Sequence, residues 1–262
     1  MKSLFDLDGK VVVITGGHGY FGTAIAEAML LHGATVMLAD IVVKEQDELK
    51  LKGQSYERLF NTYCDASDTH SIKALFHKTK QVCGKIDVLI NNACYGAGYG
   101  DSFEQMSDDV WHKGLDGAIG TAFRCTREVV PYLEENGGGS IVNVASMYGM
   151  VSPDPKVYGD SGANNPINYG AGKAAVLQLT RYCAGHLGRK NIRVNSITPG
   201  PFPHKDMQES QKDFVQKLGD KTMLGRIGEQ DEIAGAAVFL SARSSSYITG
   251  ANIIVDGGWT AW

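Results

Sequence analysis

Residues 10–22 read KVVVITGGHGYFG, a short β-branched run that passes directly into closely spaced glycines. The run 10–15 predicts a strand buried on both faces, because it offers no polar face to water. An Ala-rich stretch at 23–31 predicts a helix after the glycines, and 35–39 predicts a second strand that ends at Asp40. The order of strand, glycine turn, helix, strand and acid is typical of a dinucleotide-binding unit.

The glycines and the acid of this unit predict how a dinucleotide would bind. Gly16, Gly19 and Gly22 let the backbone approach a pyrophosphate, whose charge would lie at the N-terminus of the helix. Asp40 follows Gly22 by 18 residues, and a carboxylate about 20 residues on accepts hydrogen bonds from the adenosine ribose. It would repel a 2′-phosphate, so the sequence favours NAD over NADP. A glycine turn by itself is also an ordinary tight connection in α/β proteins. The rest of the chain therefore has to show whether this turn binds a dinucleotide.

The remainder of the chain alternates between strand and helix patterns. Strands are expected at 61–65, 86–90, 140–145, 192–197 and 253–255, and helices at 71–82, 108–133, 169–187 and 229–240. Residues 44–60 are charged and helical in character, whereas 203–225 are polar and predict a mobile helical flap. This alternation predicts a single doubly wound Rossmann-type α/β domain over residues 1–262, with a central parallel sheet of about seven strands.

The composition indicates a globular protein without a nucleic-acid or membrane partner. Hydrophobic residues make up 43% and charged residues 21% of the 262 residues, and the formal net charge is −4. No apolar run approaches the roughly 20 residues of a membrane span, and the first residues lack the apolar region of a signal peptide. The five cysteines are widely spaced, which argues against a disulfide framework or a zinc site. These features predict a cytoplasmic protein with no bound metal that acts on a small molecule.

A second candidate site lies in the sequence Tyr169-Gly170-Ala171-Gly172-Lys173. On a helix, residues four apart share one face. The pKa of a tyrosine phenol is normally about 10, and a nearby ammonium group lowers that pKa because it favours the phenolate. Tyr169 beside Lys173 would then exchange a proton close to neutral pH. Such a pair also occurs by chance on helix surfaces, so the spacing alone does not identify a site.

With these pieces in order, the chain resembles the short-chain dehydrogenase/reductase family over nearly its whole length. The matching residues are Thr15-Gly16, Gly22, Asp40, Asp65, Asn91-Asn92-Ala93, Ser146, Tyr169, Lys173, Pro199-Gly200 and Val255-Asp256-Gly257-Gly258. The resemblance implies that Tyr169 is the catalytic acid/base, that Lys173 lowers its pKa and holds the nicotinamide ribose, and that Ser146 hydrogen-bonds the reacting oxygen. Without that context, Ser146 is an ordinary serine at the end of a strand.

The resemblance also implies a set of cofactor contacts and an assembly. The cofactor-binding residues would be Gly16, Gly19, Tyr20, Phe21, Asp40, Asp65, Ala66, Asn91, Ala93, Tyr169, Lys173, Pro199, Gly200 and Phe202. Asp65 would face the adenine amino group, or else cap the helix that begins near Ser67. The family implies a homotetramer, with a dimer as the alternative, and the apolar tail 259–262 is suited to an interface.

Two residues depart from the family pattern. Tyr20 stands where the middle glycine of the turn is usual, which predicts an altered phosphate loop rather than a loss of binding. Aligning the long helix 108–133 places Ala118 where the family has an asparagine that supports a water between the lysine and solvent. The proton relay is therefore expected to run differently, more slowly or not at all. An apolar stripe on the same helix predicts core or subunit contacts: Trp111, Leu115, Ile119 and Phe123.

The third departure is an insertion at 147–168. Ser146 precedes Tyr169 by 23 residues, more than the family usually has. Because the extra segment enters just before Tyr169, it is expected to border the substrate pocket, although a surface loop is the alternative. Its polar residues would suit a hydroxyl-rich substrate better than a steroid or an acyl chain. They are Asp154, Lys156, Tyr158, Asp160, Ser161, Asn164 and Asn165.

The sequence therefore predicts an NAD-dependent oxidoreductase that interconverts a secondary alcohol and a ketone on a polar, sugar-like substrate. Tyr20 and Ala118 leave open a non-catalytic NAD-binding regulatory protein, although the intact catalytic residues argue against it. An epimerase that uses transient oxidation is also open. It would show turnover without net formation of NADH.

Overall fold

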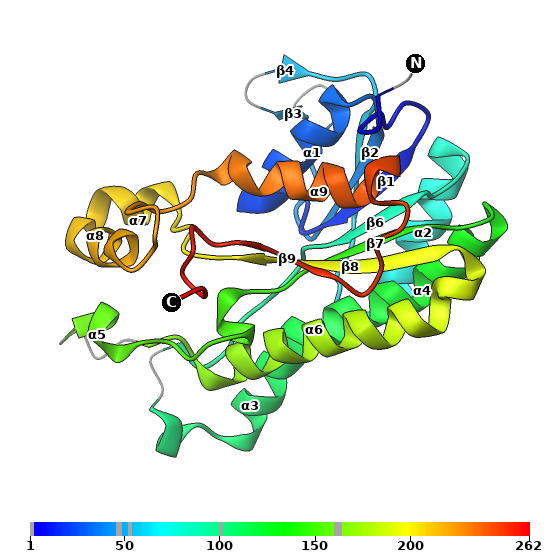
Figure 1. Cartoon of the computed structure of the whole chain (residues 1–262). Coiled ribbons are helices and arrows are strands. Elements are labelled where there is room, and N and C mark those ends of the chain that lie inside the picture. The colour runs from blue at the N-terminus through cyan, green and yellow to red at the C-terminus, as the bar shows by residue number, and fades with distance from the viewer. Residues whose placement is uncertain (1–2, 46–48, 52–53, 100–101, 160–163) are drawn as a thin grey trace.

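Seven strands form one parallel sheet in the order β5-β2-β1-β6-β7-β8-β9 (Figure 1). The computed structural model describes residues 3–45, 49–51, 54–99, 102–159 and 164–262. The strands are β1 (Val11–Thr15), β2 (Thr35–Asp40), β5 (Leu59–Tyr63), β6 (Val88–Asn91), β7 (Gly139–Val144), β8 (Ile192–Pro199) and β9 (Asn252–Val255). The strand order reverses between β1 and β6, which pair with each other. The carboxyl ends of these two strands therefore flank the crevice where such sheets bind ligands.

Helices cover both faces of the sheet. The α-helices are α1 (Tyr20–Leu31), α2 (Thr69–Cys83), α3 (Asp108–Leu115), α4 (Thr121–Glu135), α5 (Pro155–Tyr158), α6 (Ile167–Leu187), α7 (Lys205–Ser210), α8 (Lys212–Asp220) and α9 (Ala234–Ser241). Helices α1 and α9 pack on one face, and α2, α4 and α6 pack on the other (Figure 1). Among the described residues, no helix is long and apolar enough to cross a membrane.

The central strands supply both cores by alternation. Val12 and Ile14 of β1 belong to the core under α1 and α9, whereas Val13 belongs to the core under α2, α4 and α6. Successive strand residues point to opposite faces of a sheet, so an all-apolar strand fits a sheet covered on both sides. The predicted doubly wound fold with seven parallel strands is confirmed.

Residues 44–60 contain no helix in their described part, so that prediction is wrong. Two short strands, β3 (Lys50–Leu51) and β4 (Gln54–Ser55), form a separate antiparallel pair there. Leu49 and Leu51 are both buried against the core of α1. Apolar residues two apart share one face of an extended segment, and Leu49 and Leu51 place that face on the core.

The long helix expected at 108–133 is interrupted. Helix α3 passes into a π-helical turn at Asp116–Gly120 before α4 begins. Such turns are short and are often found at functional sites. Ala118 lies in this turn, is 2% exposed and packs against Gly172 of α6.

Two segments that are far apart in sequence pack together at one end of the sheet. Helix α5, within the insertion 147–168, and helix α8, within 203–225, both lie at the end where the C-terminus lies (Figure 1). A satellite hydrophobic cluster joins them through Val157, Leu218 and Trp259. We call α5 and α8 together the cap. Trp259, expected at a subunit interface, is buried in this cluster, whereas Trp262 is exposed.

Candidate active site

The glycine turn between β1 and α1 forms a tight cradle. Gly16 has a φ of +61°, a conformation that strongly favours glycine. A Cβ on Gly22 would lie 2.3 Å from the carbonyl oxygen of Gly16, so only glycine fits there. Helix α1 begins directly after Gly19 without a side-chain cap among the described residues. Its first backbone N–H groups are therefore suited to an anion such as a pyrophosphate.

A cavity of about 440 Å³ opens over this turn. Nine of the predicted cofactor residues line it: Gly16, Gly19, Tyr20, Phe21, Asp40, Asp65, Ala66, Ala93 and Phe202. Gly200 and Tyr169 line a second, larger cavity, to which Phe202 also contributes. Asn91, Lys173 and Pro199 are not among the lining residues of either cavity.

Backbone amides hold the two carboxylates of the smaller cavity. Asp40 accepts hydrogen bonds from the N–H of His18 at 2.9 Å and of Val42 at 3.2 Å. Asp65 accepts hydrogen bonds from the N–H and hydroxyl of Ser67 at 2.8 and 2.7 Å. The alternative that Asp65 caps the following helix is wrong, because Asp68 is the N-cap of α2.

Asn91 supports the sheet from its centre. Its side-chain nitrogen donates to the hydroxyl of Thr126 at 2.9 Å and to the side-chain amide oxygen of Asn143 at 2.8 Å. Thr15 holds the loop after β6 in a similar way, since its hydroxyl accepts hydrogen bonds from the N–H groups of Asn92 and Ala93, both at 3.1 Å. These contacts fix the loop after β6 beside the glycine turn.

Ser146, Tyr169 and Lys173 come together from two neighbouring elements. Ser146 follows the end of β7, and its hydroxyl accepts a hydrogen bond from the N–H of Tyr148 at 3.2 Å. Tyr169 and Lys173 lie one turn apart on α6, and the ammonium nitrogen is 5.7 Å from the centre of the Tyr169 ring. Lys173 is 4% exposed and donates to the carbonyl of Val144 at 2.8 Å. That bond ties α6 to the end of β7, two residues before Ser146.

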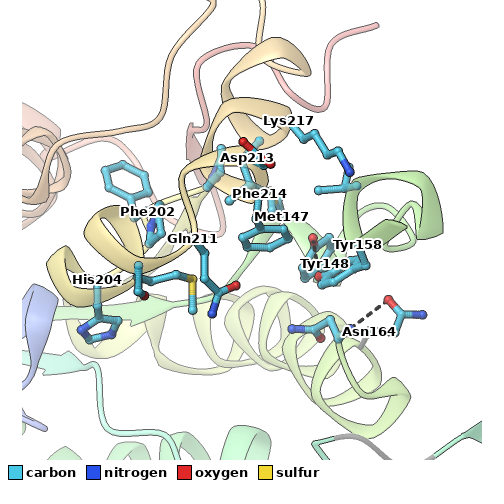
Figure 2. Close-up of a pocket in the computed structure, with 18 of the residues that line it drawn as sticks. Met147, Tyr148, Tyr158, Asn164, Phe202, His204, Gln211, Asp213, Phe214 and Lys217 are labelled. Carbon is cyan, nitrogen blue, oxygen red and sulfur yellow. Dashed lines mark hydrogen bonds between the residues drawn. The ribbon is translucent and has the colours of Figure 1, made fainter. Parts of the chain in front are cut away.

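The larger cavity has a volume of about 1230 Å³ and contains both Ser146 and Tyr169. Val157, Tyr158, Asn164 and Asn165 of the insertion line one side, and residues of 203–218 line another. Figure 2 shows Phe202 and His204 on one side of the cavity and Tyr148, Tyr158 and Asn164 on the other. Asp160 and Ser161, which were expected in this wall, lie outside the described residues.

Tyr20 occupies the position of the usual glycine without filling the glycine cradle. Its ring packs 5.5 Å from Phe21 and 4.6 Å from the imidazole of His204, measured between ring centres. Burial and the carboxylates of Glu229 and Asp231 raise the pKa of Tyr20. The tyrosine therefore joins the glycine turn to the segment that follows β8.

The sequence reasoning did not single out His204. This residue lines both cavities and so lies where they meet. The available signal was the proline-rich stretch at 199–203, which leads directly from β8 to His204. Tyr99 was also missed as a residue of the larger cavity, because the loop after β6 offers no periodic pattern.

A polar cluster surrounds the π-helical turn. Asp116 accepts hydrogen bonds from the hydroxyl of Tyr95 and from the guanidinium of Arg124. Burial and the contact with Asp116 raise the pKa of Tyr95. The cluster attaches the loop after β6 to the turn that contains Ala118, because Tyr95 belongs to this loop and Asp116 to this turn.

Comparisons with known proteins agree with this arrangement. The family model described as enoyl-(acyl carrier protein) reductase matches residues 20–260. The 3-oxoacyl-(acyl-carrier-protein) reductase FabG of Thermotoga maritima is 34% identical over 254 residues, which cover 96% of this chain and 98% of the relative.

Two solved structures differ in the cofactor that their descriptions give. A short chain dehydrogenase from Leptospira borgpetersenii with bound NAD+ has a TM-score of 0.84 at 30% identity, covering 99% of this chain and 96% of that one. The NADPH-dependent 3-quinuclidinone reductase from Rhodotorula rubra has a TM-score of 0.86 at 28% identity, covering 100% and 96%. The choice between the two cofactors therefore has to be argued from the residues of this chain.

Proposed function

The chain belongs to the short-chain dehydrogenase/reductase family, and from this premise we propose that it is an NAD-dependent enzyme that interconverts a secondary alcohol and a ketone on a polar, sugar-like substrate. One observation carries the proposal. Ser146 and Tyr169 face the same cavity, while the ammonium group of Lys173 is buried beside the Tyr169 ring.

The chemistry divides between the cofactor and the chain. A nicotinamide supplies the hydride acceptor or donor when it is bound. Ser146 donates a hydrogen bond to the reacting oxygen, which stabilises charge that develops there. Tyr169 exchanges a proton with the same oxygen, and the buried ammonium group of Lys173 lies beside the Tyr169 ring.

The residues of the smaller cavity fit NAD. The glycine cradle and the uncapped start of α1 suit a pyrophosphate. Asp40 presents a fixed carboxylate at the end of β2, where it would accept ribose hydroxyls and repel a 2′-phosphate. We therefore keep NAD as the proposed cofactor, bound by the predicted residues that line the two cavities, with His204 added to them.

Polar groups in the wall of the larger cavity support a polar substrate, and they share that wall with apolar side chains such as Met147, Phe202 and Leu218. Beside Ser146 and Tyr169 it carries the hydroxyls of Tyr148 and Tyr158 and the side-chain amides of Asn164 and Asn165. Polar groups in a pocket fix the orientation of a ligand that can hydrogen-bond to them. We also keep the homotetramer and the cytoplasm as proposals that rest on the family and on the sequence.

The test is the formation of NADH from NAD across sugars, polyols, hydroxy acids and steroid alcohols. We expect turnover from one polar class, and steroid alcohols to be poor substrates. Turnover of steroids alone would contradict the proposed substrate class. Protein that binds NADH but oxidises nothing in the panel would favour a regulatory protein, whereas conversion of a sugar without net NADH would favour an epimerase.

A further inference from the structure

A second pair of hydroxyl groups lies in the larger cavity beside the catalytic tyrosine. The hydroxyl oxygens of Tyr148 and Tyr158 are 3.0 Å apart, and both residues line the cavity that contains Ser146 and Tyr169. Tyr148 belongs to the turn after β7, whereas Tyr158 belongs to α5 of the insertion. Figure 2 shows the two side chains together on the side of the cavity near Asn164.

Both tyrosines are held in place by contacts other than their mutual hydrogen bond. The backbone N–H of Tyr148 donates to the hydroxyl of Ser146 at 3.2 Å, so its position follows that of the serine. The ring of Tyr158 packs 5.5 Å from that of Phe214 in α8. An ion pair between Asp154 and Lys221 also ties the insertion to the end of α8. A hydroxyl pair on such fixed supports can orient a ligand without a large loss of entropy.

The surroundings keep both groups protonated. Burial is the largest cause that raises the pKa of Tyr148 and of Tyr158, and the nearby Tyr169 adds to it in both cases. A neutral phenol is both a donor and an acceptor. The pair therefore matches the hydrogen-bonding capacity of an alcohol, which is also both.

We propose that Tyr148 and Tyr158 form a subsite for a second hydroxyl of the substrate, in addition to the oxygen that is oxidised or reduced. The inference rests on the proposed function, because it assigns a role in the same cavity. It narrows the substrate class to diols, hydroxyketones and larger polyols. A substrate with the second hydroxyl gains a hydrogen bond to this pair that an analogue without it cannot form, and a site that hydrogen-bonds a substrate hydroxyl discriminates against such an analogue.

The competing interpretation is that the pair only holds the insertion against the turn after β7. The two roles differ in what they do to selectivity. A loss of structure would lower turnover of every substrate by a similar factor. A loss of a substrate contact would lower turnover mainly for compounds that carry the second hydroxyl.

The experiment measures kcat/KM with NAD for matched alcohols that differ by one hydroxyl: 2-butanol against 2,3-butanediol, and cyclohexanol against cyclohexane-1,2-diol. It compares the wild type with Tyr158→Phe and Tyr148→Phe, which keep the rings. Tyr247→Phe is the matched control, because Tyr247 is fully exposed and does not line this cavity.

We expect the wild type to prefer each diol, and each of the two variants to lower the diol-to-monoalcohol ratio by about tenfold, the size of one neutral hydrogen bond. Tyr247→Phe should keep the wild-type ratio, because its hydroxyl lies outside the cavity. Turnover with an unchanged ratio in both tyrosine variants would overturn the subsite while leaving the proposed function intact. If no alcohol in the set or in the wider panel is oxidised by protein that binds NADH, the proposed function fails, and the subsite fails with it.

Discussion

We propose that Asp40 decides the choice of cofactor. Its carboxylate lies at the end of β2, lines the smaller cavity and is fixed by the N–H groups of His18 and Val42. A carboxylate that is already oriented loses little entropy when it binds two ribose hydroxyls. It also opposes a phosphate on the same ribose by like-charge repulsion.

Asp40→Ala should therefore relax the preference for NADH over NADPH. We expect the ratio of kcat/KM for NADH to that for NADPH to fall by about tenfold or more, because hydrogen bonds to a charged group are lost and the repulsion disappears. Asp65→Ala is the control, since that carboxylate lines the same cavity but follows β5. An unchanged ratio in Asp40→Ala would show that another residue selects the cofactor.

Local patterns predict individual residues of the site well where a spacing fixes the geometry. A spacing of four residues on a helix brings Lys173 beside Tyr169, and the structure shows this pair. The contact between Tyr20 and His204 could not be predicted in this way. It joins residues far apart in sequence, and no local pattern encodes which ring meets which.

At the scale of elements, the catalytic helix α6 depends on its fit against the π-helical turn. A Cβ on Gly172 would lie 2.6 Å from the Cβ of Ala118, closer than two carbons can approach. Gly172 and the small Ala118 therefore allow α6 and the turn to pack closely next to Tyr169 and Lys173. This contact gives a structural reason for a small residue at 118, where the family has an asparagine.

Gly172→Ala should destabilise the protein by about 1–3 kcal/mol, because the added methyl group overpacks the contact with Ala118. It should also lower kcat, since α6 carries the catalytic pair. Gly185→Ala is the matched control on the same helix, where a Cβ would meet nothing within 4 Å. That variant should be neutral or more stable by up to about 1 kcal/mol. Urea unfolding measures both, and equal stability of the two variants would contradict the packing argument.

Elements with a strong hydrophobic periodicity could be predicted from the sequence. Elements whose conformation depends on a few residues could not. The buried strands and α6 lie close to their expected ranges. The helix predicted over 44–60 is wrong because the charged composition of this segment hides two apolar residues, Leu49 and Leu51, that pack on the core. The π-helical turn has no marker in the sequence, since it arises from the packing of α6 and from the cluster around Asp116.

At the scale of the whole molecule, the cap (α5 and α8) depends on contacts that no sequence pattern predicts. The sequence predicts that the insertion borders the substrate pocket or forms a surface loop, and that 203–225 forms a mobile helical flap. It does not predict that Val157 and Leu218 share a buried cluster with Trp259. The pairing of such segments is set by their tertiary environment. The sequence could therefore predict that the insertion borders the substrate pocket. It could not predict that α8 lines another side of the same pocket.

The proposed homotetramer needs apolar surface outside the core, and Phe123 of α4 offers it. Its side chain is 47% exposed on the sheet face covered by α2, α4 and α6. Phe123→Arg should shift the assembly to smaller species, because a charged residue would be buried in the interface. Leu31→Arg on α1, at a residue 70% exposed, should leave the mass unchanged. Sedimentation velocity distinguishes the outcomes, and a tetramer in both variants would exclude this face of α4 as an interface.

The most direct test of the account is turnover by Tyr169→Phe on the best alcohol of the panel, measured together with NADH binding by fluorescence titration. Tyr182→Phe, on the same helix but exposed, is the control. We predict that Tyr169→Phe lowers kcat by about 10²–10⁴-fold, the usual contribution of a general acid/base, while its affinity for NADH stays close to that of the wild type. Full activity in Tyr169→Phe would contradict the mechanism proposed for Ser146, Tyr169 and Lys173.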